Sequence, residues 1–317
     1  MQELLERFSR DHWLTVKEYA LLLCYPQHSF ACRLADRVRR ERFGTGVYLR
    51  GLIDVGSICE YDCPQCPQRS SATYTHYRMR PREILECCED AWAMDVRSFV
   101  LRSGPDRFYT DKMLCSIVEK LQYRFPGCAV ALAMGERSRE CLEKLAVLGA
   151  DRYMLLHETA DRERFCRTHP PQLLHDSRLH CLNCLKDARF QTGCGFLVAD
   201  QNPMELAREL KFLEEFQPHW VELIPMGADP ATVAYLISLI RLMLPDALIC
   251  APDNDPACIL AGANMLTVNL IRTRRSFPCC GGYRADGPAD PDSLAALRQK
   301  MADIGFEVLM SPDPWNA

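Results

Sequence analysis

The chain has 317 residues, of which 48% are hydrophobic and 25% charged, so it can form a large globular domain. Its formal net charge of −4 provides no basic field for nucleic acid. Eighteen cysteines suit a secreted disulfide protein, but such domains are small, and residues 1–10 are charged rather than an apolar signal segment. The most apolar stretch, 233–245, contains Arg241 and is too short to span a membrane. We therefore expect a cytoplasmic protein without nucleic-acid or membrane partners.

Residues 1–44 show helical periodicity and predict an N-terminal helical extension. From 45 to 275, short apolar strands alternate with helices, which is typical of parallel βαβ units. The predicted strands are 47–58, 98–104, 128–135, 152–157, 192–199, 219–226, 247–252 and 264–270. The predicted helices are 81–94, 110–125, 138–149, 177–190, 204–216, 230–244 and 255–262. Eight such units favour an α/β fold closed into a (β/α)8 TIM barrel, with 276–317 as a C-terminal segment packed on it.

Local signals mark several helix ends. Pro81 suits the first turn of a helix, where its missing N–H costs nothing. Thr110 and Ser138 are typical N-cap residues, and Gly149 is a typical residue just past a helix C-terminus.

Three cysteines, Cys59, Cys63 and Cys66, share the loop ICEYDCPQCPQR after the first predicted strand. A structural zinc ion usually takes four protein ligands, and a CxxC redox pair needs two thiols. A [4Fe–4S] cluster takes four thiolates unless one iron stays open. TIM-barrel active sites lie at the C-terminal ends of the strands, where this loop falls, and Pro64 and Pro67 stiffen it. Spacing and position therefore favour a cluster with one open iron over three unrelated thiols.

The CxxxCxxC spacing after a first barrel strand resembles the radical S-adenosylmethionine superfamily. The segments GVYLRGLIDVGSIC, ALAMGERS, GADRYMLLHETAD and RTHPPQLL are similar to the branch of the [FeFe]-hydrogenase maturases HydE, with biotin synthase and methylornithine synthase. The resemblance implies an enzyme of hydrogenase cluster maturation that reductively cleaves S-adenosylmethionine at a [4Fe–4S] cluster to a 5′-deoxyadenosyl radical. It also implies a low-potential electron donor, a small or iron-bound substrate, and other hydrogenase maturases as partners. The high cysteine count, by itself, suggests an anaerobic host.

Residue by residue, the resemblance implies two groups of site residues. The cluster ligands, which are both catalytic and metal-binding, would be Cys59, Cys63 and Cys66. The residues that contact adenosylmethionine would be Ser103, Gly104, Glu158 and Arg178. Arg152 matches a basic residue that faces the barrel cavity, and His157, at a strand end, is a second candidate for binding substrate.

The sequence also departs from the HydE pattern. Leu156 stands where HydE has an arginine before HETA, Gln65 stands where an aromatic residue is usual, and the turn after Met226 differs. Three functional hypotheses remain open. They are a HydE-type maturase, a divergent relative that acts on another small sulfur- or amino-acid-derived substrate, and a non-catalytic Fe–S scaffold or carrier.

Two further cysteine pairs have weaker functional signals. Cys181 and Cys184 lie on an apolar stripe of a predicted helix, so core packing explains them better than redox chemistry. Cys279 and Cys280 are adjacent, and a second cluster there would lack ligands.

Overall fold

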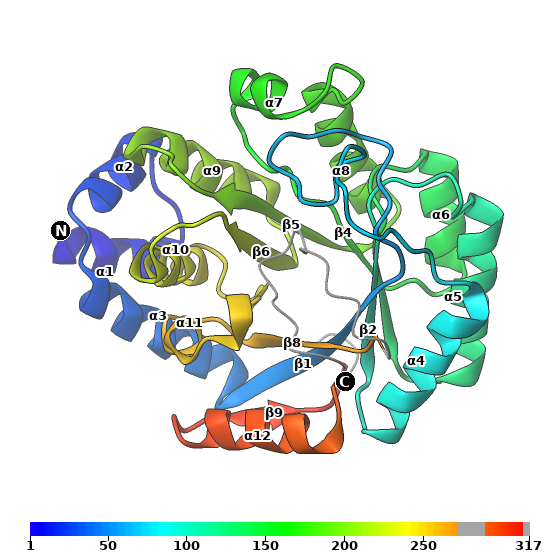
Figure 1. The fold of residues 1–317 in the computed structure, drawn as a ribbon. Coiled ribbons are helices and arrows are strands. Elements are labelled where there is room, and N and C mark those ends of the chain that lie inside the picture. Colours follow the sequence, from blue (N-terminus) through cyan, green and yellow to red (C-terminus); the bar gives the residue numbers. More distant parts are fainter. Residues whose placement is uncertain (272–288, 313–317) are drawn as a thin grey trace.

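The computed structural model describes residues 1–271 and 289–312. Eight parallel strands form a nearly closed barrel in the order β7-β6-β5-β4-β3-β2-β1-β8 (Figure 1). The strands are β1 (Gly46–Asp54), β2 (Ser98–Arg102), β3 (Ala129–Ala133), β4 (Arg152–Met154), β5 (Gln191–Val198), β6 (Trp220–Pro225), β7 (Leu248–Ile249) and β8 (Met265–Asn269). A single bridge from Cys250 to Met265 joins the β7 and β8 edges. The predicted barrel is confirmed.

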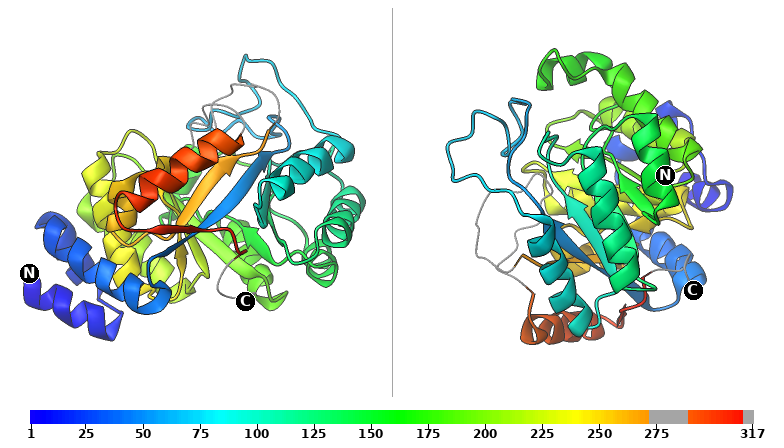
Figure 2. Two further views of the ribbon diagram at one scale, coloured as in Figure 1. Left: turned by 90° about the horizontal axis from the view of Figure 1, so that it is seen from below. Right: turned by 90° about the vertical axis from the view of Figure 1, so that its right-hand side faces the viewer.

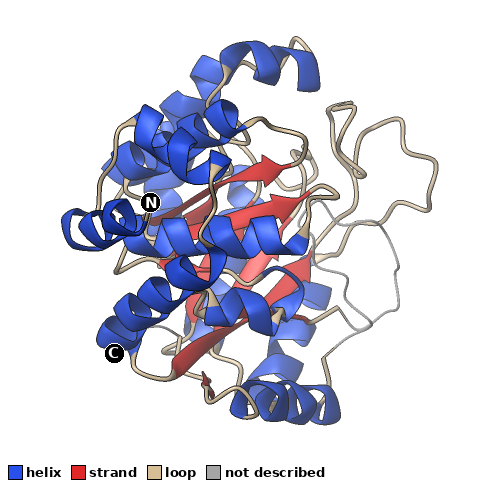
Figure 3. Ribbon diagram, turned by 90° about the vertical axis from the view of Figure 1, so that its left-hand side faces the viewer, coloured by secondary structure: helices blue, strands red, loops and turns tan. Residues whose placement is uncertain are grey.

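Helices cover the outside of the barrel, as the view from the side shows (Figure 3). They are α4 (Pro81–Ala93), α5 (Asp111–Arg124), α6 (Arg139–Val147), α7 (Arg162–Thr168), α8 (His175–Asp187), α9 (Pro203–Phe216), α10 (Pro230–Met243) and α11 (Pro256–Leu260), with the 3-10 turn η1 (Pro252–Asn254) before α11. The short helix α7 is absent from the sequence prediction. Its seven residues carry little helical periodicity, and Asp161 starts it by accepting a hydrogen bond from the backbone N–H of Arg164.

The predicted helix ends are confirmed. The Thr110 hydroxyl accepts a hydrogen bond from the N–H of Met113 at 3.3 Å, and Ser138 accepts one from Cys141 at 3.2 Å. Gly149 follows α6 with a φ of 95°, in the left-handed region that glycine adopts without strain.

Three helices precede the barrel, α1 (Gln2–Asp11), α2 (Val16–Cys24) and α3 (His28–Phe43). Helix α2 packs on α9, and α3 packs on α10, which explains why α10 is apolar on all sides. Arg241 within α10 is buried, but its guanidinium donates to carbonyl oxygens and to Asn264 Oδ1 at 2.8 Å. Across the described parts of the chain, no helix is long and apolar enough to cross a membrane.

The last described residues pack beside β1 (Figure 2). Helix α12 (Pro291–Ala302) is followed by strand β9 (Glu307–Leu309), which pairs in parallel with the start of β1. Beyond β9, the carbonyl oxygen of Pro312 accepts hydrogen bonds from Arg152 at 3.5 Å. The barrel is thereby closed at the end where its strands begin.

The inner surface of the barrel combines small and large side chains. Alternate positions of a strand face the same side, so Ala131 of β3 and Gly193 of β5 face inward with Trp220 of β6. A Cβ atom on Gly193 would lie 2.0 Å from Trp220 Nε1. Small residues on β3 and β5 therefore leave room for the indole of β6 and for a cavity above it.

Candidate active site

One cavity lies at the C-terminal ends of the barrel strands, and seven of the predicted site residues line it. They are Cys59, Cys63, Cys66, Ser103, Gly104, Glu158 and Arg178. These residues come from the loop after β1, the loop after β2, the turn after β4 and helix α8. The departures Leu156, Gln65 and Met226 line the same cavity. Cys279 and Cys280 lie outside the described residues.

The cysteine loop is tied to the loop after β2. The N–H of Glu60 donates to the carbonyl oxygen of Pro105 at 2.9 Å, and the N–H of Arg107 donates to Glu60 Oε1 at 2.7 Å. Gly104 lies directly against Cys59, because a Cβ atom on Gly104 would lie 2.8 Å from Cys59 Cβ. The two loops therefore hold the first cysteine in place from both sides.

The donor set suits a cluster better than a single ion. Cys59 and Cys63 are buried, Cys66 is partly exposed, and the N–H of Tyr61 donates to Cys59 Sγ at 3.4 Å. Within residues 1–271 and 289–312, no three His, Cys, Asp or Glu side chains form a group that could hold a metal ion as it stands. A [4Fe–4S] cube takes each thiolate at a different corner, so its ligands stand further apart than those of one ion. Three thiols from one loop around one cavity fit that need.

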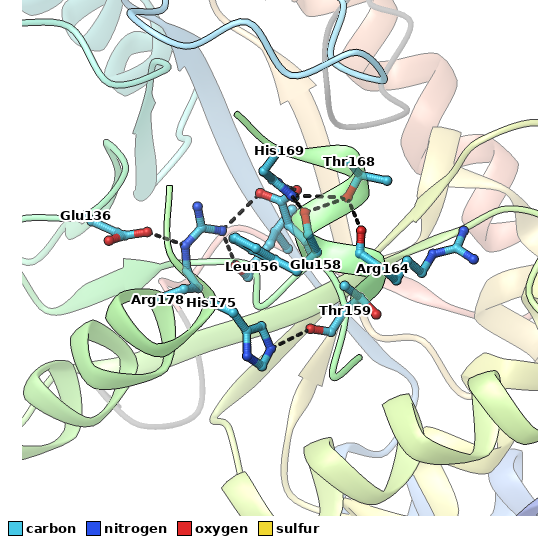
Figure 4. A network of polar contacts seen from close by, with 10 residues as sticks. Glu136, Leu156, Glu158, Thr159, Arg164, Thr168, His169, His175 and Arg178 are labelled. Carbon is cyan, nitrogen blue, oxygen red and sulfur yellow. Dashed lines mark hydrogen bonds and ion pairs between the residues drawn. The ribbon is translucent and has the colours of Figure 1, made fainter. Parts of the chain in front are cut away.

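Glu158 and Arg178 form the polar centre of the cavity wall (Figure 4). Arg178 donates through Nη1 to Glu158 at 2.9 Å and through Nε to Glu136 at 2.7 Å. His169 Nε2 contacts the other Glu158 oxygen at 2.7 Å. Burial alone would raise the pKa of Glu158, but the hydrogen bond to His169 and the charge of Arg178 outweigh it and lower this pKa to about 2. Glu158 is therefore ionised at neutral pH.

Three buried polar atoms along the cavity have no hydrogen-bond partner among the described residues. They are Ser103 Oγ, Gln65 Oε1 and Trp220 Nε1. Buried polar atoms are nearly always paired in folded proteins, so unpaired ones in a cavity mark positions where a ligand can complete them. The cavity therefore offers unused donors and acceptors both beside the cysteines and at its floor.

Deeper in the cavity, arginines are paired with carboxylates. Arg102 binds Asp54 through two hydrogen bonds of 2.5 and 3.0 Å, and Arg50 lies 3.2 Å from Glu222. The Arg50 guanidinium also lies over the Trp220 ring, 5.1 Å from its centroid. Sequence reasoning missed Arg50, Glu222 and Trp220. The available signal was an isolated polar residue within an otherwise apolar strand, because a buried charged side chain there points to a polar barrel interior.

The two candidate substrate-binding residues do not line the cavity. Arg152 begins β4, at the opposite end of the barrel from the cysteine loop, and its Nε donates to Gln191 Oε1 at 2.7 Å. Burial, chiefly, lowers the pKa of Arg152 to about 10. His157 follows Leu156, and successive residues of an extended chain point to opposite sides, so its ring lies outside the sheet, against Cys194 and Glu209. Neither side chain therefore lines the cavity beside the cysteine loop, although Arg152 points into the barrel interior at the opposite end.

A scan of the chain against protein-family models gives no match. The chain is 32% identical over 260 residues to the [FeFe] hydrogenase maturase subunit HydE of Thermotoga maritima, covering 75% of this chain and 74% of that protein. It is 23% identical over 295 residues to 3-methylornithine synthase of Methanosarcina acetivorans, covering 86% of this chain and 83% of that enzyme.

Solved structures of two enzymes share the fold. Methylornithine synthase (PylB) superposes with a TM-score of 0.84 at 20% identity, covering 96% of this chain and 97% of that one. The hydrogenase maturase HydG from Carboxydothermus hydrogenoformans superposes with a TM-score of 0.83 at 17% identity, covering 97% and 79%. The fold, the cysteine loop and the similarity to HydE agree. The chain belongs to the family of radical S-adenosylmethionine enzymes that contains the maturase HydE.

Proposed function

We propose that this protein binds a [4Fe–4S] cluster through Cys59, Cys63 and Cys66 and reductively cleaves S-adenosylmethionine, as a HydE-like enzyme of [FeFe]-hydrogenase cluster maturation. One observation carries the proposal: the three cysteines and the Glu158–Arg178 pair line the same cavity. The similarity to a HydE protein over three quarters of the chain supports the maturation role. A low-potential electron donor and other maturases, as partners in the cytoplasm, are part of the same proposal.

The protein's own residues have separate tasks in this proposal. When bound, the cluster supplies the electron that cleaves the cofactor, and the protein supplies binding and orientation. The ionised Glu158 offers an acceptor to the positively charged cofactor, while Arg178 and His169 fix its carboxylate. The unpaired Ser103 hydroxyl, beside Gly104, offers a further contact. Apolar walls, including Leu52 and Val100, exclude water below.

A second candidate is a divergent enzyme that acts on another small sulfur- or amino-acid-derived substrate. Leu156 lines the cavity at the position where the HydE pattern has an arginine. The deeper arginines, Arg50 and Arg102, are each already paired with a carboxylate, so neither is a simple replacement for that cation. The similarity to methylornithine synthase is compatible with this reading. A non-catalytic carrier is disfavoured, because the Glu158–Arg178 pair would have no task in it.

Two experiments test these proposals in sequence. Anaerobic reconstitution followed by dithionite and adenosylmethionine should yield 5′-deoxyadenosine, and a loaded protein that yields none would contradict the radical enzyme. Expression in a strain that lacks HydE, with hydrogenase activity as the measurement, then separates the two enzymatic candidates. Restored activity supports the maturase, whereas 5′-deoxyadenosine formation without restored activity supports the divergent enzyme.

A further inference from the structure

A buried carboxylate outside the cavity organises the turn that carries Glu158. Glu209 of α9 is only 1% exposed and accepts three hydrogen bonds from the segment after β4. Its donors are His157 Nε2 at 3.0 Å, Thr159 Oγ1 at 2.6 Å and the N–H of Ala160 at 2.7 Å. The two oxygens of one side chain therefore hold the residues on both sides of Glu158.

Glu158 needs such support because its backbone is strained. Its φ of 67° lies in the left-handed region, which is strained for a residue with a Cβ atom. Two hydrogen bonds join its backbone to β5, from its N–H to Gly195 at 3.2 Å and from the N–H of Leu197 to its carbonyl oxygen at 3.3 Å. Glu158 lines the cavity, while His157, the residue before it, faces away.

The His157 ring lies in a buried contact with Cys194 and Glu209. Burial disfavours the protonated ring of His157, but Cys194 and Glu209 outweigh burial and raise its pKa to about 9. The ring also lies 4.2 Å from the ring of Phe212, measured between centroids. Since neither His157 nor Glu209 is exposed, loss of the carboxylate leaves a buried imidazole without its counter-charge.

We propose that Glu209 is a positioning residue for adenosylmethionine. It holds the left-handed turn in the one arrangement that brings the Glu158 carboxylate to Arg178 and His169. The inference rests on the proposed function, in which Glu158 contacts the cofactor. Glu209 itself is absent from the cavity wall, so its effect on the cofactor passes through the turn.

The same helix provides a matched control. Glu214 lies five residues further along α9 and is also largely buried. It accepts hydrogen bonds from the N–H of Leu14 at 3.0 Å and from Tyr19 Oη at 2.7 Å, and it pairs with Lys211. Its contacts tie the N-terminal helices to the barrel and do not reach the cavity. Substitution of Glu214 therefore reports the general cost of removing a buried carboxylate from α9.

The test compares Glu209→Gln and Glu214→Gln in the reconstituted holoprotein. Three quantities are measured for each: iron and sulfide content, thermal unfolding, and the dissociation constant of adenosylmethionine from its effect on the EPR spectrum of the reduced cluster. We expect Glu209→Gln to weaken cofactor binding about tenfold at full cluster content. Glu214→Gln should lower the unfolding temperature and leave cofactor affinity unchanged. A purely structural role for Glu209 would make the two variants alike.

A second variant, at Thr159, tests the role of Glu209 independently. Thr159→Val removes one of the three hydrogen bonds and keeps the ion pair, so it should weaken cofactor binding about threefold even where Glu209→Gln gives no folded protein. Wild-type affinity for adenosylmethionine in Thr159→Val, or in a folded Glu209→Gln variant, overturns the inference about Glu209 but not the proposed function. A wild-type holoprotein that does not bind adenosylmethionine overturns the proposed function itself.

Discussion

Glu158 and Arg178 lie 20 residues apart in the sequence, with helix α7 between them, yet their side chains are 2.9 Å apart. The left-handed backbone of Glu158 turns its carboxylate toward α8, and Arg178 lies in the first turns of that helix. Burial lowers the pKa of Arg178, but the charges of Glu158 and Glu136 outweigh burial and raise it above the ordinary value. Both Glu158 and Arg178 are therefore charged at any physiological pH.

Arg178→Ala should weaken adenosylmethionine binding without loss of the cluster. The substitution removes a charge-assisted hydrogen bond of about 1.5–3 kcal/mol to Glu158, which corresponds to a 10- to 100-fold loss of affinity. Titration of the reduced cluster by EPR gives the affinity. Arg162→Ala is the control, because the Arg162–Asp176 pair is exposed and contributes little. Equal affinity in both variants would show that Arg178 does not support the cofactor.

Replacement of Cys59, Cys63 and Cys66 by alanine should abolish the iron–sulfur absorbance and the EPR signal, since all three protein ligands of the cluster are removed. The control is the double variant of Cys181 and Cys184, two buried thiols of α8, which should keep its cluster. Iron and sulfide analysis after anaerobic reconstitution is the measurement. A triple variant with full iron and sulfide content would refute the assignment.

Gly104→Ala should make the cluster labile. The new methyl group would lie 2.8 Å from Cys59 Cβ and 3.1 Å from its Sγ atom, so the ligand must shift. Gly127→Ala is the control, because its Cβ would meet nothing within 4 Å, although its φ of 82° implies a stability cost of about 1 kcal/mol. We expect reduced iron content only in Gly104→Ala, and equal iron content in the two variants would contradict the tight contact.

His157, in contact with Cys194 and Glu209, should make the stability of the protein depend on pH above neutrality. The pKa of His157 is raised from 6.5 to about 9, so folding gains from its protonation below pH 6.5. This gain, on the order of 3 kcal/mol, is lost as the pH rises from about 6.5 to about 9. Urea unfolding of the holoprotein across this range measures it. His157→Asn should flatten the profile, and an unchanged slope in that variant would point to other groups.

The sequence predicted the barrel, and most of the site residues it singled out line one cavity, whereas Arg152 and His157 do not. Strand–helix alternation and the spacing of the cysteines are local patterns, so they can be recognised in the sequence alone. His157 faces away because it follows Leu156 in an extended segment, and the apolar run 153–156 before it does not indicate which face of the strand points inward. Arg50 and Glu222 are brought together by closure of the barrel, and strand propensity carries no information on that pairing.

The secondary structure of the region below the cavity could not be predicted from the sequence either. Helix α12 and strand β9 lie after the last barrel strand, where 276–317 predicted only a packed segment. The parallel pairing of β9 with β1 joins residues 46–48 to residues 307–309, which are far apart in the sequence. The composition of neither strand indicates with which strand it pairs.

The contact of Pro312 with Arg152 has a kinetic consequence. This contact closes the barrel at the end where the strands begin. The space beside Trp220 and the space beside the cysteine loop belong to one cavity, which opens at the loops. In the proposed function, a substrate beside Trp220 would enter before adenosylmethionine fills the space beside the cysteine loop, and its product would leave after it. We therefore expect ordered binding, to which a contact at the far end of the barrel from the cysteine loop contributes.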